Sequence, residues 1–385
     1  MTPNRHGRML DVIGIETTLR CDQACVFCGS RAGRRGSEEL TTSELVDIFE
    51  QAVKMGARSI DLTGGETYLR EDWLDLLRAI RALGVESAIV TAGHGIDESV
   101  AKQAADAGLS RVAVSIDGPA EIHDSLRRTP NSYEHARRAV ESFRNAGVPV
   151  SCNTQLNARN WRALPQLADV LVGAGLYGWQ LQLMIPMGRA SEVESLVLQP
   201  YEFLEIIPLV ARVIERCAAE GLKIAPADNL GYFGPHEHWL RKTTSKRGHS
   251  VGCAAGVSLL GIDAAGNVTG CSALDASEVC AGNVRKHSLQ ELWDTAPELR
   301  MGLSLSHVWG FCATCYYSRV CRGGCSATAI ALTGRRGNNP YCHHRALEWA
   351  RQGMGERLVR RSEVHEGRRG HALFDIEVGP LRALP

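Results

Sequence analysis

The chain has 385 residues, of which 43 are basic and 43 acidic, so its formal net charge is zero. This balance excludes a broadly basic nucleic-acid-binding protein. A membrane span is also excluded, because even the most apolar region, 164–186, contains Asp169, Gln180 and Gln182. The first ten residues lack the apolar core of a signal peptide. We therefore expect a cytoplasmic protein with no nucleic-acid and no membrane partner.

Short apolar runs alternate with amphipathic stretches over the first half of the chain. The apolar runs predict strands at 10–17, 59–63, 86–92, 111–117, 149–155 and 178–184. Five stretches typical of helices separate them. This alternation predicts an α/β fold with helices covering a parallel sheet. Six units favour a partial (β/α)6 TIM-like barrel over a closed eight-fold one, with the active site at the carboxyl ends of the strands.

Changes in composition predict four segments. Residues 1–195 form the barrel, and 196–247 form a bridging helical region. Residues 248–345 are rich in cysteine and glycine, so a small domain there would need metal to stabilise it. Residues 346–385 are predicted to be a C-terminal helix followed by an irregular tail.

The thirteen cysteines point to metal binding, because a reducing cytosol disfavours disulfides and an odd number cannot pair completely. Cys21, Cys25 and Cys28 form a C-x3-C-x2-C loop directly after the first predicted strand. Three thiolates can hold three irons of a [4Fe–4S] cluster and leave the fourth iron open. The alternative is three packed or zinc-binding cysteines, but zinc usually takes a fourth ligand at short range and none follows in this loop.

With this triplet, two further motifs make the chain similar to the radical SAM superfamily. Thr63-Gly64-Gly65-Glu66 ends the second predicted strand and matches the GGE motif, and Ser115-Ile116-Asp117-Gly118 ends the fourth. The resemblance implies that S-adenosylmethionine binds the open iron. It also implies that an electron from the cluster cleaves this ligand to a 5′-deoxyadenosyl radical, which abstracts a substrate hydrogen.

The same resemblance implies a set of S-adenosylmethionine contacts. The ligand's ammonium group would lie at the GGE motif, and its carboxylate or ribose at the segment that ends strand four. Asn153 and Gln182, which are polar residues within apolar strands, would also line the site. The alternative is that they make hydrogen bonds within the core. The implied contacts are Gly64, Gly65, Glu66, Ser115, Asp117, Arg127, Asn153 and Gln182. Thr67 replaces the usual proline and Ala92 the usual asparagine, so the resemblance does not define the details of the adenine pocket.

Seven C-terminal cysteines reproduce the spacing of the SPASM domain found in some radical SAM enzymes. The resemblance implies two auxiliary [4Fe–4S] clusters. One would be held by Cys312, Cys315, Cys321 and Cys342, and the other by Cys253, Cys271 and Cys325. The latter cluster would have an open iron or take Cys280 as a ligand. Zinc is the alternative for the group from Cys312 to Cys325.

Three cysteines fall outside these patterns. Cys152 and Cys217 are expected in the core. Cys280 has three open interpretations: a cluster ligand, a hydrogen-atom donor to a substrate radical, or a structural residue.

The resemblance sets the radical chemistry but not the substrate. Our leading hypothesis is a maturase that modifies a ribosomally made peptide by crosslinking, epimerisation or oxidation, with a reductant such as flavodoxin or ferredoxin. A peptide-presenting partner is left open. One alternative is a small-molecule dehydrogenase or epimerase, for example on an aminocyclitol. Another is a non-enzymatic iron–sulfur electron-transfer protein. Ser272 stands where sulfatase-oxidising relatives have an aspartate, which argues against that activity.

Overall fold

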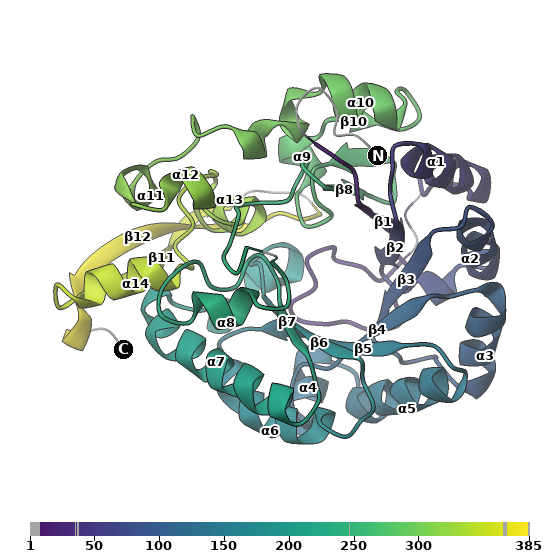
Figure 1. Cartoon of the computed structure of the whole chain (residues 1–385), viewed down its shortest axis with the longest axis horizontal. Coiled ribbons are helices and arrows are strands. Elements are labelled where there is room, and N and C mark those ends of the chain that lie inside the picture. Colours follow the sequence, from purple (N-terminus) through teal and green to yellow (C-terminus); the bar gives the residue numbers. More distant parts are fainter. Residues whose placement is uncertain (1–7, 35, 37, 246, 365–367, 384–385) are drawn as a thin grey trace.

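The architecture comes from a computed structural model that describes residues 8–34, 36, 38–245, 247–364 and 368–383. The first seven residues of the predicted barrel segment and the last two of the predicted tail lie outside the described residues. The fold is mixed α/β with a mostly parallel sheet, as the sequence predicts (Figure 1).

Six parallel strands form the centre of the sheet and follow one another in chain order. Each lies within two residues of its predicted position. They are β1 (Val12–Thr18), β2 (Ser59–Gly64), β3 (Glu86–Thr91), β4 (Arg111–Ser115), β5 (Val150–Leu156) and β6 (Gly178–Leu183).

Helices form an outer layer around these strands (Figure 1). They are α1 (Thr42–Lys54), α2 (Trp73–Ala82), α3 (Glu98–Ala107), α4 (Ala120–Arg127), α5 (Ser132–Asn145), α6 (Leu164–Leu171) and α7 (Phe203–Ala219). The main core lies between the two layers and contains strand residues such as Ile13 and Leu62 and helix residues such as Phe49 and Leu76, all at most 1% exposed. The first helix begins at a capping box between Thr41 and Glu44, a typical helix start.

The sheet continues past the predicted barrel on both sides. Within the bridging region, β7 (Ile224–Pro226) pairs with β6 and precedes α8 (Glu237–Arg241). On the other side, β8 (Leu259–Ile262) runs parallel to β1, and β9 (Asn267–Thr269) and β10 (Gly282–Asn283) follow as antiparallel strands. The barrel and the cysteine-rich segment therefore share one ten-stranded sheet.

Short helices carry most of the remaining cysteine-rich segment. They are α9 (Ala276–Val279), α10 (Leu289–Thr295), α11 (Phe311–Thr314), α12 (Ser318–Cys321), α13 (Ser326–Thr333) and α14 (His343–Ala350). Single 3₁₀ turns occur at Thr67–Leu69, Trp161–Ala163, Gly188–Glu192, Glu194–Leu196, Pro200–Glu202, Pro297–Leu299, Met301–Leu303 and Leu381–Ala383.

The predicted C-terminal helix and irregular tail are wrong beyond Ala350. The chain turns at Gly353, whose φ of 71° is left-handed, and then forms an antiparallel hairpin of β11 (Met354–Val364) and β12 (Ala372–Pro380). Leu358 and Phe374 are buried in the core. Charged residues pair across the two strands, as in the bond from Arg357 to Glu377.

Candidate active site and cysteine groups

A cavity of about 400 Å³ lies at the carboxyl ends of the parallel strands. Its wall contains every predicted site residue of the barrel except Asp117. These residues are Cys21, Cys25, Cys28, Gly64, Gly65, Glu66, Ser115, Arg127, Asn153 and Gln182. The structure thus brings together residues that lie up to 161 positions apart in sequence at the place where this class of fold has its active site.

The three N-terminal cysteines lie on the loop between β1 and α1. Arg189 holds this loop in place by donating to the carbonyl groups of Cys25 (2.8 Å) and Ala32 (2.9 Å). Burial raises the pKa of Cys21 to about 12 and also raises that of Cys25. Converging, buried thiols of this kind suit a metal cluster, whose positive charge stabilises thiolates.

The GGE motif contains glycine because its backbone passes very close to the loop that follows β1. A Cβ atom on Gly65 would lie 1.9 Å from the carbonyl oxygen of Arg20, and one on Gly64 would lie 2.3 Å from that of Thr18. The Glu66 N–H donates to the Arg20 carbonyl at 2.7 Å. This close contact places Glu66 beside the cysteine loop.

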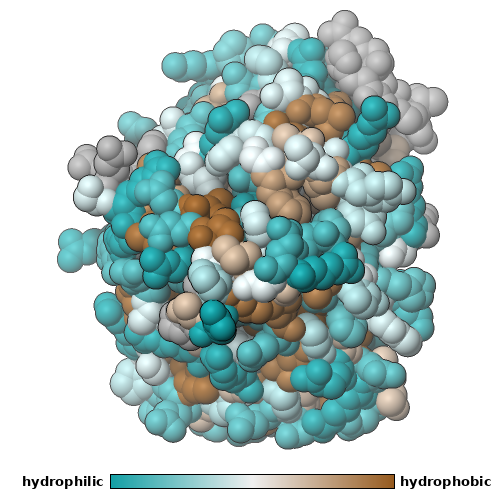
Figure 2. Space-filling model, turned by 90° about the vertical axis from the view of Figure 1, so that its left-hand side faces the viewer, coloured by the Kyte–Doolittle hydropathy of each residue, from teal (hydrophilic) through white to brown (hydrophobic). Residues whose placement is uncertain are grey.

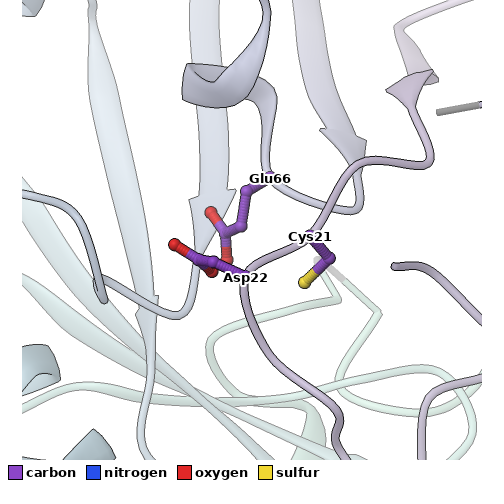
Figure 3. A group of neighbouring side chains, drawn as sticks. All are labelled: Cys21, Asp22 and Glu66. Atoms are coloured by element: carbon purple, nitrogen blue, oxygen red, sulfur yellow. The ribbon is translucent and has the colours of Figure 1, made fainter. Parts of the chain in front are cut away.

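Glu66, Asp22 and Cys21 converge at this point (Figure 3), with one ligand atom from each within 4.8 Å of the others. Burial raises the pKa of Glu66 to about 7, although its carboxylate accepts hydrogen bonds from the Thr91 hydroxyl (2.6 Å) and the Ala92 N–H (2.7 Å). Three acidic groups together favour a cationic partner, such as an ammonium group or a metal centre. The sequence analysis missed Asp22.

Asp117 lies behind the cavity wall and holds Arg127. Its carboxylate accepts bonds from the Arg127 guanidinium at 2.9 and 2.5 Å and from the Gln155 N–H at 3.0 Å. Arg127 is buried, and its Nη1 lies 3.7 Å from the Cys25 sulfur. The structure therefore gives Asp117 contacts that position Arg127 beside the cysteine loop.

Four carboxamides form a block on two neighbouring strands. Asn153 and Gln155 of β5 lie opposite Gln180 and Gln182 of β6, and all four line the cavity. None of these side chains makes a hydrogen bond to the described part of the chain. Strand alternation from Asn153 and Gln182 could have predicted Gln155 and Gln180, which the sequence analysis left unassigned.

The cavity is bordered on another side by Arg369, which precedes β12. Arg369 is 7% exposed and pairs at 3.1 Å with Glu16 of β1, which is 2% exposed. It also donates to the carbonyl groups of Ser272 and Leu274, while its buried Nε has no partner. Burial alone would raise the pKa of Glu16, but Arg369 and Arg368 outweigh burial and lower it. No sequence pattern predicted this contact.

The structure brings C-terminal cysteines together in two groups. Burial and the neighbouring Cys253 and Cys271 raise the pKa of Cys325 to about 12. In the second group, burial and then Cys312 and Cys315 raise the pKa of Cys321 to about 12, and burial followed by Cys321 and Cys312 raises that of Cys342. Each group has the donor chemistry of a cluster site.

Tyr232 lies between these two groups. Its buried hydroxyl accepts a hydrogen bond from the Cys325 N–H at 2.8 Å, and its carbonyl oxygen lies 3.6 Å from the Cys342 sulfur. The sequence analysis did not identify this residue.

Cys280 is not part of either group among the described contacts. Its thiol donates to the Gly282 carbonyl at 3.2 Å, and it does not line the cavity. Cys152 and Cys217 are fully buried in the core, as predicted.

Fold and site together define a parallel-sheet protein with a three-cysteine cluster loop at the end of its first strand. The chain matches the Radical SAM superfamily over residues 15–159 and the SPASM iron-sulfur cluster-binding domain over 253–316. The chain therefore contains a radical SAM domain and, C-terminal to it, a SPASM domain. The first domain implies a [4Fe–4S] cluster and S-adenosylmethionine, and the second implies auxiliary iron–sulfur clusters.

Two relatives that are named for different activities each align with most of the chain. The AdoMet-dependent heme synthase of Oleidesulfovibrio alaskensis is 28% identical over 86% of each chain. The mycofactocin maturase MftC of Mycobacterium tuberculosis is 29% identical over 83% of this chain and 80% of its own. The structure of Streptococcus suis SuiB bound to S-adenosylmethionine has a TM-score of 0.68 at 18% identity and covers 87% of this chain and 76% of its own, which shows a shared fold.

No helix among the described residues is both long and apolar enough to cross a membrane.

Proposed function

We propose that this protein is a radical SAM maturase that modifies a peptide. The observation that carries the proposal is the block of four carboxamides facing the cavity without partners in the described chain. A carboxamide both donates and accepts hydrogen bonds, as a peptide group does. Asn153 and Gln182 are the predicted S-adenosylmethionine contacts, which leaves Gln155 and Gln180 for the substrate. The PqqA peptide cyclase of Rhizobium meliloti, which is 24% identical over 85% of each chain, supports the same substrate class by its name.

The chain's own residues would bind and orient the reactants. Cys21, Cys25 and Cys28 would hold the cluster, and Glu66 with the backbone of Gly65 would receive the ammonium group of S-adenosylmethionine. When bound, the cluster and S-adenosylmethionine supply the radical that removes a hydrogen atom from the substrate. The cysteine groups of the SPASM domain would hold two auxiliary clusters.

The test is anaerobic reconstitution with iron, sulfide, S-adenosylmethionine and dithionite, followed by incubation with peptides encoded beside the gene. We expect 5′-deoxyadenosine and a mass change in one peptide. The variant Cys28→Ala should form neither product. The volume-conserving variant Gln180→Met should bind S-adenosylmethionine normally but show a raised KM for the peptide. Normal 5′-deoxyadenosine formation on a small molecule, with no peptide changed, would contradict the peptide assignment.

Arg369 favours a second candidate substrate, a tetrapyrrole that bears carboxylates. Its buried Nε has no partner at the cavity, and a guanidinium group binds carboxylates well. The heme synthase relative supports this class. Incubation with iron coproporphyrin in place of the peptide, followed by mass spectrometry, distinguishes the two candidates.

A further inference from the structure

A buried tyrosine, Tyr232, contacts both cysteine groups of the C-terminal half. Its hydroxyl accepts a hydrogen bond from the Cys325 N–H at 2.8 Å, and its carbonyl oxygen lies 3.6 Å from the Cys342 sulfur. The residue therefore spans the space between the groups. We call them the first cysteine group, which is Cys253, Cys271 and Cys325, and the second cysteine group, which is Cys312, Cys315, Cys321 and Cys342.

Tyr232 lies in a loop with an unusual backbone. Gly231, Tyr232, Phe233 and Gly234 follow one another with positive φ angles of 115°, 72°, 57° and 115°. Tyrosine and phenylalanine rarely adopt this conformation, because the Cβ atom then lies too close to the carbonyl oxygen. Strained residues of this kind persist only where the surrounding structure holds them, and they are concentrated at functional sites.

Two buried charged residues hold this loop. Arg241 is 1% exposed and donates to the carbonyl groups of Ala227, at 3.1 Å, and Leu230. The carboxylate of Glu237 accepts a hydrogen bond from the Phe233 N–H at 2.9 Å. The position of the tyrosine is therefore set by contacts that the bridging region makes within itself.

The Tyr232 side chain is enclosed by protein. It is 2% exposed and packs with Phe233 and Cys321 in a small cluster behind α12. An added Cβ atom on Gly324 would lie 3.1 Å from its ring. The outer side of this region, which carries α11, α12 and α14, shows hydrophobic patches among hydrophilic residues (Figure 2). Beneath that surface, the hydroxyl donates to the Asp228 carbonyl at 2.5 Å while it accepts the bond from the first cysteine group.

The N–H that Tyr232 accepts belongs to a residue that would hold a cluster. Hydrogen bonds to the sulfur atoms are one of the ways in which a protein sets the reduction potential of an iron–sulfur cluster. A donor at the sulfur atoms raises the potential, because it stabilises the more negative, reduced state. By accepting the Cys325 N–H, the Tyr232 hydroxyl withholds such a donor.

We infer that Tyr232 is a positioning residue that lowers the reduction potential of the cluster at the first cysteine group by keeping the Cys325 N–H away from the sulfur atoms. The inference rests on the proposed function, which places auxiliary clusters at these cysteines. Each cluster takes up or releases one electron, and no atom or proton is transferred. A lower potential at the first group means that an electron shared by the two clusters lies more often on the second.

An EPR-monitored redox titration of the reconstituted full-length chain tests this role. Every sample carries Cys28→Ala, which removes the cluster of the N-terminal loop, and we call this chain the parent. The signal that disappears when Cys342→Ala is added belongs to the second group. The variant is Tyr232→Phe, which keeps the ring and removes the hydroxyl. Its control is Tyr341→Phe, because Tyr341 is also buried and precedes Cys342, but its hydroxyl donates to the Leu198 carbonyl at 2.7 Å.

In Tyr232→Phe, the Cys325 N–H loses its acceptor and is free to donate to the cluster, so the first cluster should be reduced more easily. At the parent's midpoint potential, we expect the ratio of reduced to oxidised first cluster to rise about tenfold, which is a shift of about +59 mV for one electron. The second cluster should keep its potential, and Tyr341→Phe should change neither.

Iron and sulfide analysis shows whether the clusters are present. If the parent takes up no auxiliary cluster, the cluster assignment of the proposed function fails and the inference fails with it. If the clusters are present and Tyr232→Phe leaves the first potential unchanged, only the role of Tyr232 is overturned. An equal shift in Tyr341→Phe would also overturn it, since the loss of any buried hydroxyl would then have the same effect.

A second measurement applies if Tyr232→Phe loses iron. The parent is then labelled with 3-fluorotyrosine, whose fluorine weakens the hydroxyl oxygen as an acceptor. We expect the potential of the first cluster to rise in the labelled protein as well, and an unchanged potential there would rule out the inference.

Discussion

Gly65 shows how closely two loops pass at the candidate active site. Because a Cβ atom there would lie 1.9 Å from the Arg20 carbonyl oxygen, Gly65→Ala must push the cysteine loop away from the GGE motif. We expect the substitution to lower the free energy of unfolding by about 1–3 kcal/mol and to lower iron uptake. Thermal unfolding and iron analysis measure both effects. Gly33→Ala, in the same loop with no atom within 4 Å of the added carbon, is the control and should change neither.

His123 makes part of the stability depend on pH. It is fully buried, its Nδ1 accepts the Asp117 N–H at 3.1 Å, and burial lowers its pKa to about 4. In the unfolded chain the pKa of this histidine is ~6.5, so the unfolded state takes up a proton before the folded state does as pH falls. About 3 kcal/mol of stability should therefore be lost between pH 6.5 and 4.

Urea unfolding at pH 7.5, 6 and 5 measures this dependence. In His123→Gln the loss of stability on acidification should be smaller than in the wild type. An equal loss in both proteins would show that other groups account for it.

Single residues were predictable where a polar side chain interrupts an apolar strand, as at Asn153 and Gln182. Gln155 and Gln180 could have been found by alternation along the same strands. Asp22 and Arg369 could not, because their surroundings come from elements that are distant in sequence.

At the scale of elements, the C-terminal hairpin braces the site. Arg369→Met leaves the buried carboxylate of Glu16 with Arg368 as its remaining charged partner. Breaking a buried pair in this way should lower the free energy of unfolding by about 3 kcal/mol. We expect a lower thermal midpoint and faster hydrogen exchange in β11 and β12.

A second substitution tests whether the charge pair is the cause. Adding Glu16→Gln to Arg369→Met removes the buried charge and should restore part of the stability. If the double variant is as unstable as the sum of the two single variants, the pair is not coupled.

Long elements were predictable and short ones were not. The six central strands have five to seven residues each, which is enough for an apolar run to be recognised. The strands β7, β9 and β10 have two or three residues, and their pairing is set by neighbours rather than by a pattern. The hairpin was missed because its strands are held by pairing with each other, as between Arg357 and Glu377, rather than by an apolar run.

At the scale of the whole molecule, iron content tests the assignment of the cysteines. Cys342→Ala removes a thiol from a buried group and should lower iron and sulfide per chain by about one cluster. Cys280→Ala should leave both unchanged, because the hydrogen bond that the structure gives its thiol among the described residues goes to the Gly282 carbonyl. Equal iron in both variants would contradict the assignment of Cys342, and a loss in Cys280→Ala would make Cys280 a ligand.

The predicted segments and the observed sheet differ for a physical reason. Composition separates the barrel from the cysteine-rich segment, but the pairing of Val12 with Leu259 joins them in one sheet. Hydrogen bonding between distant strands leaves no trace in the composition of either.

The position of β1 between β2 and β8 determines when the sheet can form completely during synthesis. The ribosome makes β1 before β2, but β8 and the arginine that pairs with Glu16 follow much later, the arginine 353 residues after Glu16. Until then one edge of β1 is unpaired and the loop of Cys21, Cys25 and Cys28 is uncovered. A nascent chain of this kind folds late and needs protection from aggregation. In return, the loop of the candidate cluster site stays accessible until β8 and Arg369 have been made.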